Sequence, residues 1–145
     1  MVKSLLSQLK VDRAYVVRLG EGDELITSVG KLAMENDVKG AFFVGIGAFK
    51  SFSLGFFKEG KYVKEELALQ VEVASCTGNV SLKEGKPFVH CHVVLRDESG
   101  KVYAGHLFEG MVYPTFELLL LPVAEAKLVR KYDPATNLFL LDVER

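Results

Sequence analysis

Residues 87–108, which read PFVHCHVVLRDESGKVYAGHLF, decide the fold. Two runs rich in β-branched and aromatic residues, 88–95 and 102–108, lie on either side of the turn-forming sequence DESG at 97–100. Strand-forming runs joined by a short glycine-containing connection are typical of a β-hairpin. The segment therefore predicts two antiparallel strands.

The position of Gly100 predicts how the two strands are aligned. A three-residue hairpin loop with a bulge needs glycine in its last position, where the backbone is left-handed. Residues 98–100 meet that requirement, which makes Asp97 pair with Lys101. Counting back along the strands then places His92 opposite His106, whereas a two- or four-residue loop would place Cys91 there.

Three histidines lie close together in this hairpin. Side chains at positions i and i+2 of a strand project from the same face, so His90 and His92 can converge while Cys91 points away. With His106 opposite His92, three imidazoles and an open position form the kind of site that binds zinc, with other divalent transition ions behind it. The alternative is that the histidines are ordinary surface or core residues. Cys91, like Cys76, is interpreted as a buried inert thiol.

The rest of the chain reads as short strands with one strong helix. Apolar residues at helical spacing follow Asp23, which is the expected N-cap, and the helix should end near Asn36. The run 40–49 is apolar on both faces, as in a buried central strand, and its Gly45-Ile46-Gly47 predicts a bulge or a close-packing point. Further strands are expected at 14–19, 51–57, 67–75, 79–82, 115–123 and 138–143.

These elements predict an α+β fold with a mostly antiparallel sheet and one main helix, in a single compact domain over residues 1–145 with its core at about 13–141. Six phenylalanines crowd into residues 42–57, more than one small core can bury. Some of them are expected at a subunit interface, in a trimer or a dimer.

Composition narrows the class of protein. The chain of 145 residues is 49% hydrophobic and 26% charged, which excludes an intrinsically disordered protein. Its net charge of −1 argues against nucleic acid as a partner of the whole domain. No apolar run is long enough to span a membrane, and residues 1–10 contain no signal-peptide core. We therefore expect a cytoplasmic protein with reduced thiols and no membrane partner.

Five short motifs, in order, resemble the PPC domain (plants and prokaryotes conserved). They are RLGEGDEL at 18–25, GIGA at 45–48, SCTGNV at 75–80, HCH at 90–92 and GHL at 105–107. The resemblance implies a stand-alone prokaryotic type of unassigned biochemical role that assembles as a homotrimer. It also implies a zinc site at the positions of His90, His92 and His106.

Plant members of that family join the domain to an AT-hook built around Arg-Gly-Arg-Pro, which enters the DNA minor groove. This sequence has no such motif, so DNA binding lacks its usual carrier here. A cupin also uses His-x-His on a strand, but the residues after His92 lack the glutamate of the cupin pattern.

Two hypotheses of function follow. The first is a metal-dependent protein that binds a small molecule or performs metal-assisted chemistry on it. The second is an oligomerisation or DNA-associated regulatory module with a structural metal or none. The sequence assigns no catalytic residue, and it does not choose among Arg18, Glu72, Glu109 and Glu117 as partners of the site.

Overall fold

The computed structural model of the chain describes residues 7–11 and 13–145; residues 1–6, which carry part of the signal-peptide argument, lie outside the described residues. One helix, α1, spans Leu25–Glu35. The strands are β1 (Lys10–Val11), β2 (Tyr15–Gly20), β3 (Ala41–Lys58), β4 (Lys61–Leu67), β5 (Val71–Lys83), β6 (Lys86–Arg96), β7 (Val102–Ala124), β8 (Lys127–Asp133) and β9 (Leu138–Glu144). No helix among the described residues is long and apolar enough to cross a membrane.

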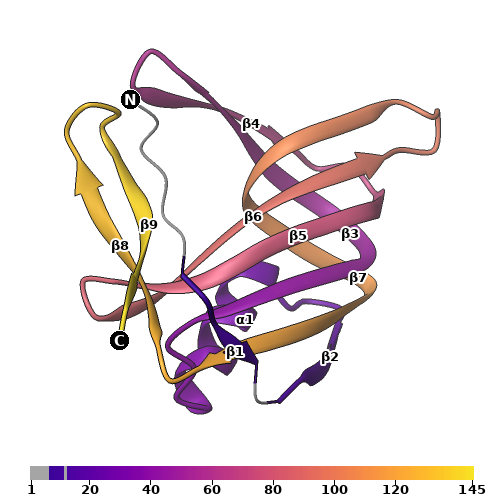
Figure 1. Cartoon of the computed structure of the whole chain (residues 1–145). Helices are drawn as coiled ribbons and strands as arrows, with labels where there is room; N and C mark the ends of the chain where they lie inside the picture. Colours follow the sequence, from indigo (N-terminus) through magenta and orange to yellow (C-terminus); the bar gives the residue numbers. More distant parts are fainter. Residues whose placement is uncertain (1–6, 12) are drawn as a thin grey trace.

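Four long strands pair in a closed circuit. Strand β3 pairs with β5, β5 with β6, β6 with the first part of β7, and β7 with β3, all antiparallel. Strand β2 adds to β7, β4 adds to β3, and the β8–β9 hairpin touches the edge of β5 through one parallel pair, Leu82 with Val129 (Figure 1). The α+β prediction with a mostly antiparallel sheet and one helix is confirmed.

Several strands are longer than the sequence predicted. The runs 40–49 and 51–57 belong to the single strand β3, and 102–108 and 115–123 belong to β7. The run 67–75 is instead divided, because residues 68–70 are not strand, and 79–82 continues β5. Strands β1 and β8, and all of β4 except Leu67, were not predicted. A bend in a strand and a break between strands leave the same local pattern, so only the pairing partners distinguish them.

The helix begins one residue later than predicted. Glu24, not Asp23, is the N-cap, and its carboxylate accepts hydrogen bonds from the amides of Ile26 and Thr27. It also accepts from the Gly110 amide at 2.9 Å, which ties the start of α1 to β7. Asp23 accepts from the Gly20 amide and closes the preceding turn. The predicted end holds, because Asn36 is the C-cap.

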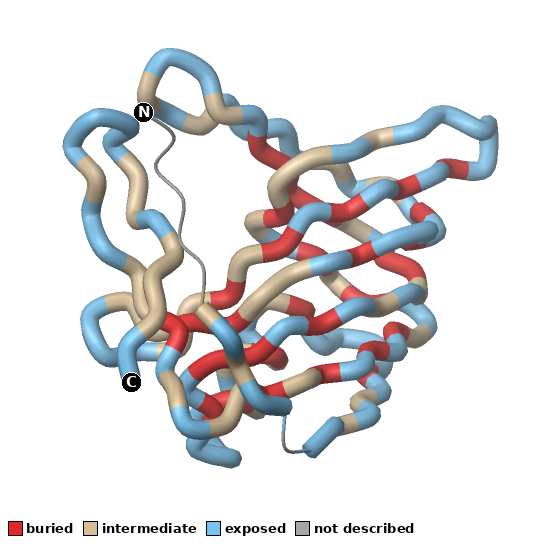
Figure 2. The backbone as a smooth tube through the Cα atoms, viewed as in Figure 1, coloured by how far each residue is buried: buried red, intermediate tan, exposed pale blue. Residues whose placement is uncertain are grey.

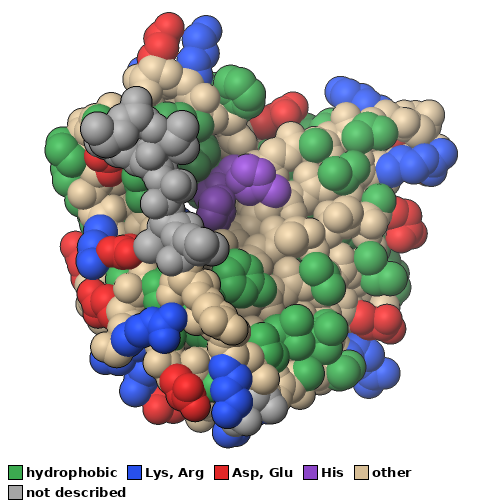
Figure 3. All heavy atoms as spheres, in the orientation of Figure 1, with side chains coloured by type: hydrophobic (Ala, Val, Ile, Leu, Met, Phe, Trp, Pro, Cys, Tyr) green, Lys and Arg blue, Asp and Glu red, His purple; other side chains and the backbone are tan. Residues whose placement is uncertain are grey.

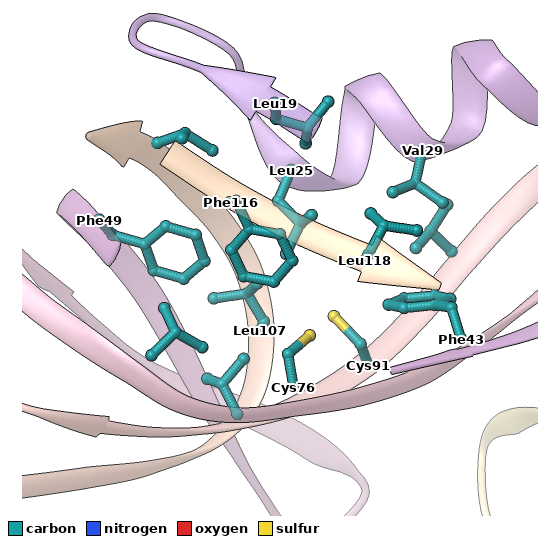
Figure 4. Packing of buried hydrophobic residues seen from close by; sticks show 14 of the residues in the cluster. Leu19, Leu25, Val29, Phe43, Phe49, Cys76, Cys91, Leu107, Phe116 and Leu118 are labelled. Atoms are coloured by element: carbon teal, nitrogen blue, oxygen red, sulfur yellow. The ribbon is translucent and has the colours of Figure 1, made fainter. Parts of the chain in front are cut away.

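The core lies between α1 and one face of the sheet. The buried helix residues pack over side chains from β3, β5, β6 and β7, and the rings of Phe49 and Phe116 stack at 5.7 Å (Figure 4). Buried residues are concentrated in these strands, whereas the residues at the hairpin tips are mostly exposed (Figure 2). The Gly45–Gly47 bulge is confirmed by a register shift against β5.

The opposite face of β3 is open. The sequence predicted that both faces of residues 40–49 would be buried, and that prediction is wrong for the chain alone. Ala41, Phe43 and Phe49 are buried, but Phe42, Val44 and Ile46 are exposed, with Ile46 at 58%. The sheet therefore has one face covered by α1 and one apolar face without cover among the described residues.

Close packing at the bulge leaves no room for a side chain at Gly47. A Cβ there would lie 2.5 Å from the Thr115 carbonyl oxygen and 2.6 Å from the Phe116 Cα. We expect Gly47→Ala to lower the free energy of unfolding by about 1–3 kcal/mol, the usual cost of overpacking. Gly20→Ala is the control, because nothing lies within 4 Å of its Cβ position. Urea denaturation of both variants checks this, and equal effects would contradict it.

Candidate metal centre

The predicted hairpin register is confirmed. His92 pairs with His106 across β6 and β7. The Asp97 amide donates to the Lys101 carbonyl at 3.0 Å, and Gly100 has a φ of 88°. These are the pairing and the left-handed glycine that the three-residue loop required.

Asp97 holds this turn in place. Its carboxylate accepts hydrogen bonds from the Ser99 amide and hydroxyl, the Lys101 amide and the Tyr103 hydroxyl, at 2.6–3.1 Å. The bonds from Ser99, with those from Lys101 and Tyr103, lower the pKa of Asp97. The carboxylate therefore stays ionised at neutral pH and fixes the end of the hairpin that carries the histidines.

The three histidines converge on one point. The Nε2 atoms of His90 and His92 are 3.3 Å apart, and one ring nitrogen from each of the three histidines lies within 4.8 Å of the others. Their ring centroids are 5.0–5.6 Å apart. His90 and His106 are half-buried and His92 is exposed, so the cluster lies in a recess that opens to the surface (Figure 3).

The separation of the His90 and His92 nitrogens fits a tetrahedral metal. Two nitrogens bound at about 2.0–2.1 Å to one tetrahedral zinc ion are about 3.3–3.4 Å apart, which is the separation of the His90 and His92 Nε2 atoms. The buried Nδ1 of His106 has no hydrogen-bond partner among the described residues. Buried polar atoms are normally satisfied, so an unpaired imidazole nitrogen is typical of a site built for a ligand.

The surroundings keep His90 and His106 neutral. Burial, followed by the positive charge of Arg130 and by His92, lowers the pKa of His90 to about 4. Burial, then the other two histidines, Arg130 and Lys64, lowers the pKa of His106 to about 4. A metal binds the unprotonated ring, so both side chains are in the ligand form at neutral pH.

The structure brings to the site residues that the sequence did not identify. Arg130 of β8 lies beside His90, with 3.4 Å between its Nη2 and the His90 Nδ1. The rings of Tyr62 and Phe108 flank His106 at centroid distances of 4.7 and 4.6 Å. Phe108 could have been found from the strand pattern, since it is two residues beyond His106. Arg130 and Tyr62 come from distant strands and leave no local signal.

The other residues considered from the sequence do not join the cluster. Arg18, Glu72, Glu109 and Glu117 are exposed, and the histidine contacts described above include none of them. Cys91 and Cys76 are buried on the opposite face, free of any disulfide, and point toward each other (Figure 4). A hydrogen bond that the Cys91 thiol shares with Cys76, together with burial, raises the pKa of Cys91, which agrees with the inert thiol that was predicted.

Comparison with known proteins identifies the family. Residues 6–124 match the model of the Plants and Prokaryotes Conserved (PCC) domain. The chain therefore belongs to this family, as the sequence motifs indicated.

Solved structures share the fold over nearly the whole chain. The metal-containing protein AF0104 of Archaeoglobus fulgidus is 34% identical, with a TM-score of 0.90, covering 95% of this chain and 99% of its own. A PPC protein of Pyrococcus horikoshii is 35% identical, with a TM-score of 0.89 and coverages of 96% and 97%. A protein of Ralstonia eutropha, provisionally named DNA-binding, is 29% identical, with a TM-score of 0.81 and coverages of 88% and 90%.

A curated relative is much longer than this chain. The bifunctional protein GlmU of Synechococcus sp. (strain JA-3-3Ab) is 26% identical over 136 residues, which are 92% of this chain and 21% of that protein. The chain thus spans about a fifth of the length of the curated relative it matches.

The lowered pKa values predict how the metal-stripped protein responds to acid. Both folded pKa values lie near 4, below the ordinary value of 6.5, so between these values the unfolded chain binds more protons. Stability is therefore lost as the pH falls from about 6.5 to about 4. His90→Gln should show a shallower fall, measured by urea denaturation at several pH values. Identical slopes for the two proteins would contradict this.

Proposed function

We propose that His90, His92 and His106 bind one divalent metal ion, with zinc foremost and other divalent transition ions behind it. The observation that carries the proposal is the convergence of three imidazoles from two paired strands, with the His90 and His92 Nε2 atoms 3.3 Å apart. An all-imidazole set suits zinc, copper, nickel or iron, and zinc is the most common ion in such sites. The metal-containing Archaeoglobus protein supports the proposal by similarity.

The position of the site favours ligand binding over a purely structural role. Structural zinc sites are closed by four protein ligands, whereas three histidines leave a position open. When bound, zinc with an open position supplies Lewis-acid chemistry. The histidines lie on the face away from the core, so packing around Phe49 and Phe116 does not depend on them. We therefore propose binding of a small molecule, or metal-assisted chemistry on it, as the function.

Metal analysis tests the site directly. Plasma mass spectrometry of the purified protein should find about one zinc per chain, and His90→Ala and His106→Ala should lose it. Val94→Ala is the matched control, because Val94 follows His92 on the same exposed face of β6 and offers no ligand atom.

A protein that stays metal-free after incubation with zinc would overturn the site, as would full retention in both histidine variants. Chelation should leave the circular dichroism spectrum unchanged. Unfolding on chelation would instead assign the metal a structural role.

The open apolar face supports self-association as a second proposal. Val16 of β2 pairs with Leu119 of β7, and Leu119 pairs with Val44 of β3, so these exposed side chains form one continuous patch with Phe42 and Ile46. Val16 is 88% exposed. Contiguous apolar surface of this kind marks an interaction site, and a second copy of the chain fits its lack of charge. We propose a homotrimer built on this face.

Light scattering after size-exclusion chromatography tests the assembly. The wild type should elute with three times the chain mass of 16.0 kDa. Val44→Glu should dissociate it, because an interfacial carboxylate would be buried without a partner. Met34→Glu is the control, since Met34 is an exposed apolar residue of α1 outside the patch. A monomeric wild type, or a Val44→Glu variant of unchanged mass, would contradict the proposal.

An oligomerisation module is thus the alternative if the metal site fails. The provisional name of the Ralstonia protein, a DNA-binding protein, supports a DNA-associated role. The net charge of −1 gives it no electrostatic support.

A further inference from the structure

Arg130 is held beside the histidine cluster by two polar residues of β5. Its Nε donates to the Ser81 Oγ at 2.9 Å, and its Nη2 donates to the Asn79 Oδ1 at 2.7 Å. Asn79 pairs with His90 across β5 and β6. The strand register therefore places the guanidinium on the face that carries the histidines.

Further contacts fix the orientation of the guanidinium. Its carbon lies 5.5 Å from the centre of the Phe88 ring, and Phe88 is the partner of Ser81 on β6. Its Nη1 donates to the Phe139 carbonyl at 3.4 Å. The group is thus anchored from β5, β6 and β9 at once, and such preorganisation lowers the entropic cost of binding a ligand.

No carboxylate balances this charge within the described part of the chain. The hydrogen-bond partners of Arg130 are a hydroxyl, an amide, a backbone carbonyl and an imidazole. Arg130 is half-buried, so the cation is partly removed from water. A cation that is taken out of water loses solvation, and an anion placed beside it compensates for that loss. Lys64, which acts electrostatically on His106, adds a second positive charge near the cluster.

Metal binding would leave Arg130 with an unused donor. Arg130 Nη2 lies 3.4 Å from the His90 Nδ1. A neutral imidazole that binds a metal through Nε2 carries its proton on Nδ1 and cannot accept a hydrogen bond there. Two N–H groups, one from Arg130 and one from His90, would then face each other. A negatively charged oxygen atom between them would accept a hydrogen bond from each of these two N–H groups.

We propose that Arg130 binds the anionic group, a carboxylate or a phosphate, of a small molecule that also reaches the metal at the three histidines. This inference rests on the proposed metal site and names the substrate class for it. The planar fork of arginine matches either oxyanion through two parallel hydrogen bonds. The rings of Tyr62 and Phe108 beside His106 provide apolar contact for the rest of the molecule.

Calorimetric titration with sodium acetate and with inorganic phosphate tests the anion site. Both probes are titrated into zinc-loaded and metal-stripped protein, and the preferred probe distinguishes a carboxylate from a phosphate ligand. We expect binding by the wild type and an affinity about tenfold or more lower in Arg130→Gln, the usual loss for a charge-assisted hydrogen bond. Arg130→Lys should also bind more weakly, because lysine lacks the fork.

Lys127→Gln is the matched control. It removes the same charge from the same strand at an exposed position three residues away, and we expect its affinity to change by less than about twofold. Thermal denaturation establishes that each variant is folded, and Arg130→Lys keeps the charge and the long aliphatic chain if Arg130→Gln does not fold.

The outcomes separate the two proposals. Zinc binding without anion binding, or anion affinities in both Arg130 variants equal to the wild type, would overturn the anion site and leave the metal site standing. Arg130-dependent anion binding by a protein that takes up no zinc would support the anion site and overturn the metal site.

Discussion

The pairing of His92 with His106 is the constraint on which the site depends. Side chains alternate along a strand, so a slip of one residue would replace His92 by Cys91 and send both strand histidines to the core face. The turn prevents that slip. Gly100 provides the left-handed position, and the Asp97 carboxylate collects four hydrogen bonds from the residues that follow it. A shift of the register by one residue would therefore break the hydrogen bonds of this turn and bury two imidazoles.

The closed circuit of β3, β5, β6 and β7 then gives the sheet two chemically different faces. The inner face carries the buried cysteines and the stacked rings of Phe49 and Phe116, covered by α1. The outer face carries the histidines and, one strand away, Asn79. Strand β5 approaches β6 closely at Gly78, where a Cβ would collide with the backbone of His90. The next residue, Asn79, holds Arg130 against the histidine cluster.

Local chemistry explains which features the sequence could predict. The hairpin register followed from one glycine and one turn, and the bulge followed from Gly45 and Gly47, because each depends on neighbouring residues. The N-cap was misplaced by one residue, since Asp23 and Glu24 are both acidic and the distant Gly110 amide selects Glu24. Arg130 could not be found, because the contact of β8 with β5 is a single parallel pair between strands far apart in the chain. The exposure of Ile46 could not be predicted either. An apolar strand has the same sequence pattern whether its outer face packs against its own chain or against another chain.

The apolar face and the histidine cluster are parts of one surface. A single row of paired residues crosses the sheet from the patch to the site, in the order Val16, Leu119, Val44, Thr77, His92 and His106. Val44 and His92 are thus separated only by Thr77. A second copy of the chain seated on the patch would border the histidine recess, lower the local dielectric and strengthen the attraction between Arg130 and an anion. The proposed interface and the proposed ligand site are therefore neighbours on one face of the sheet.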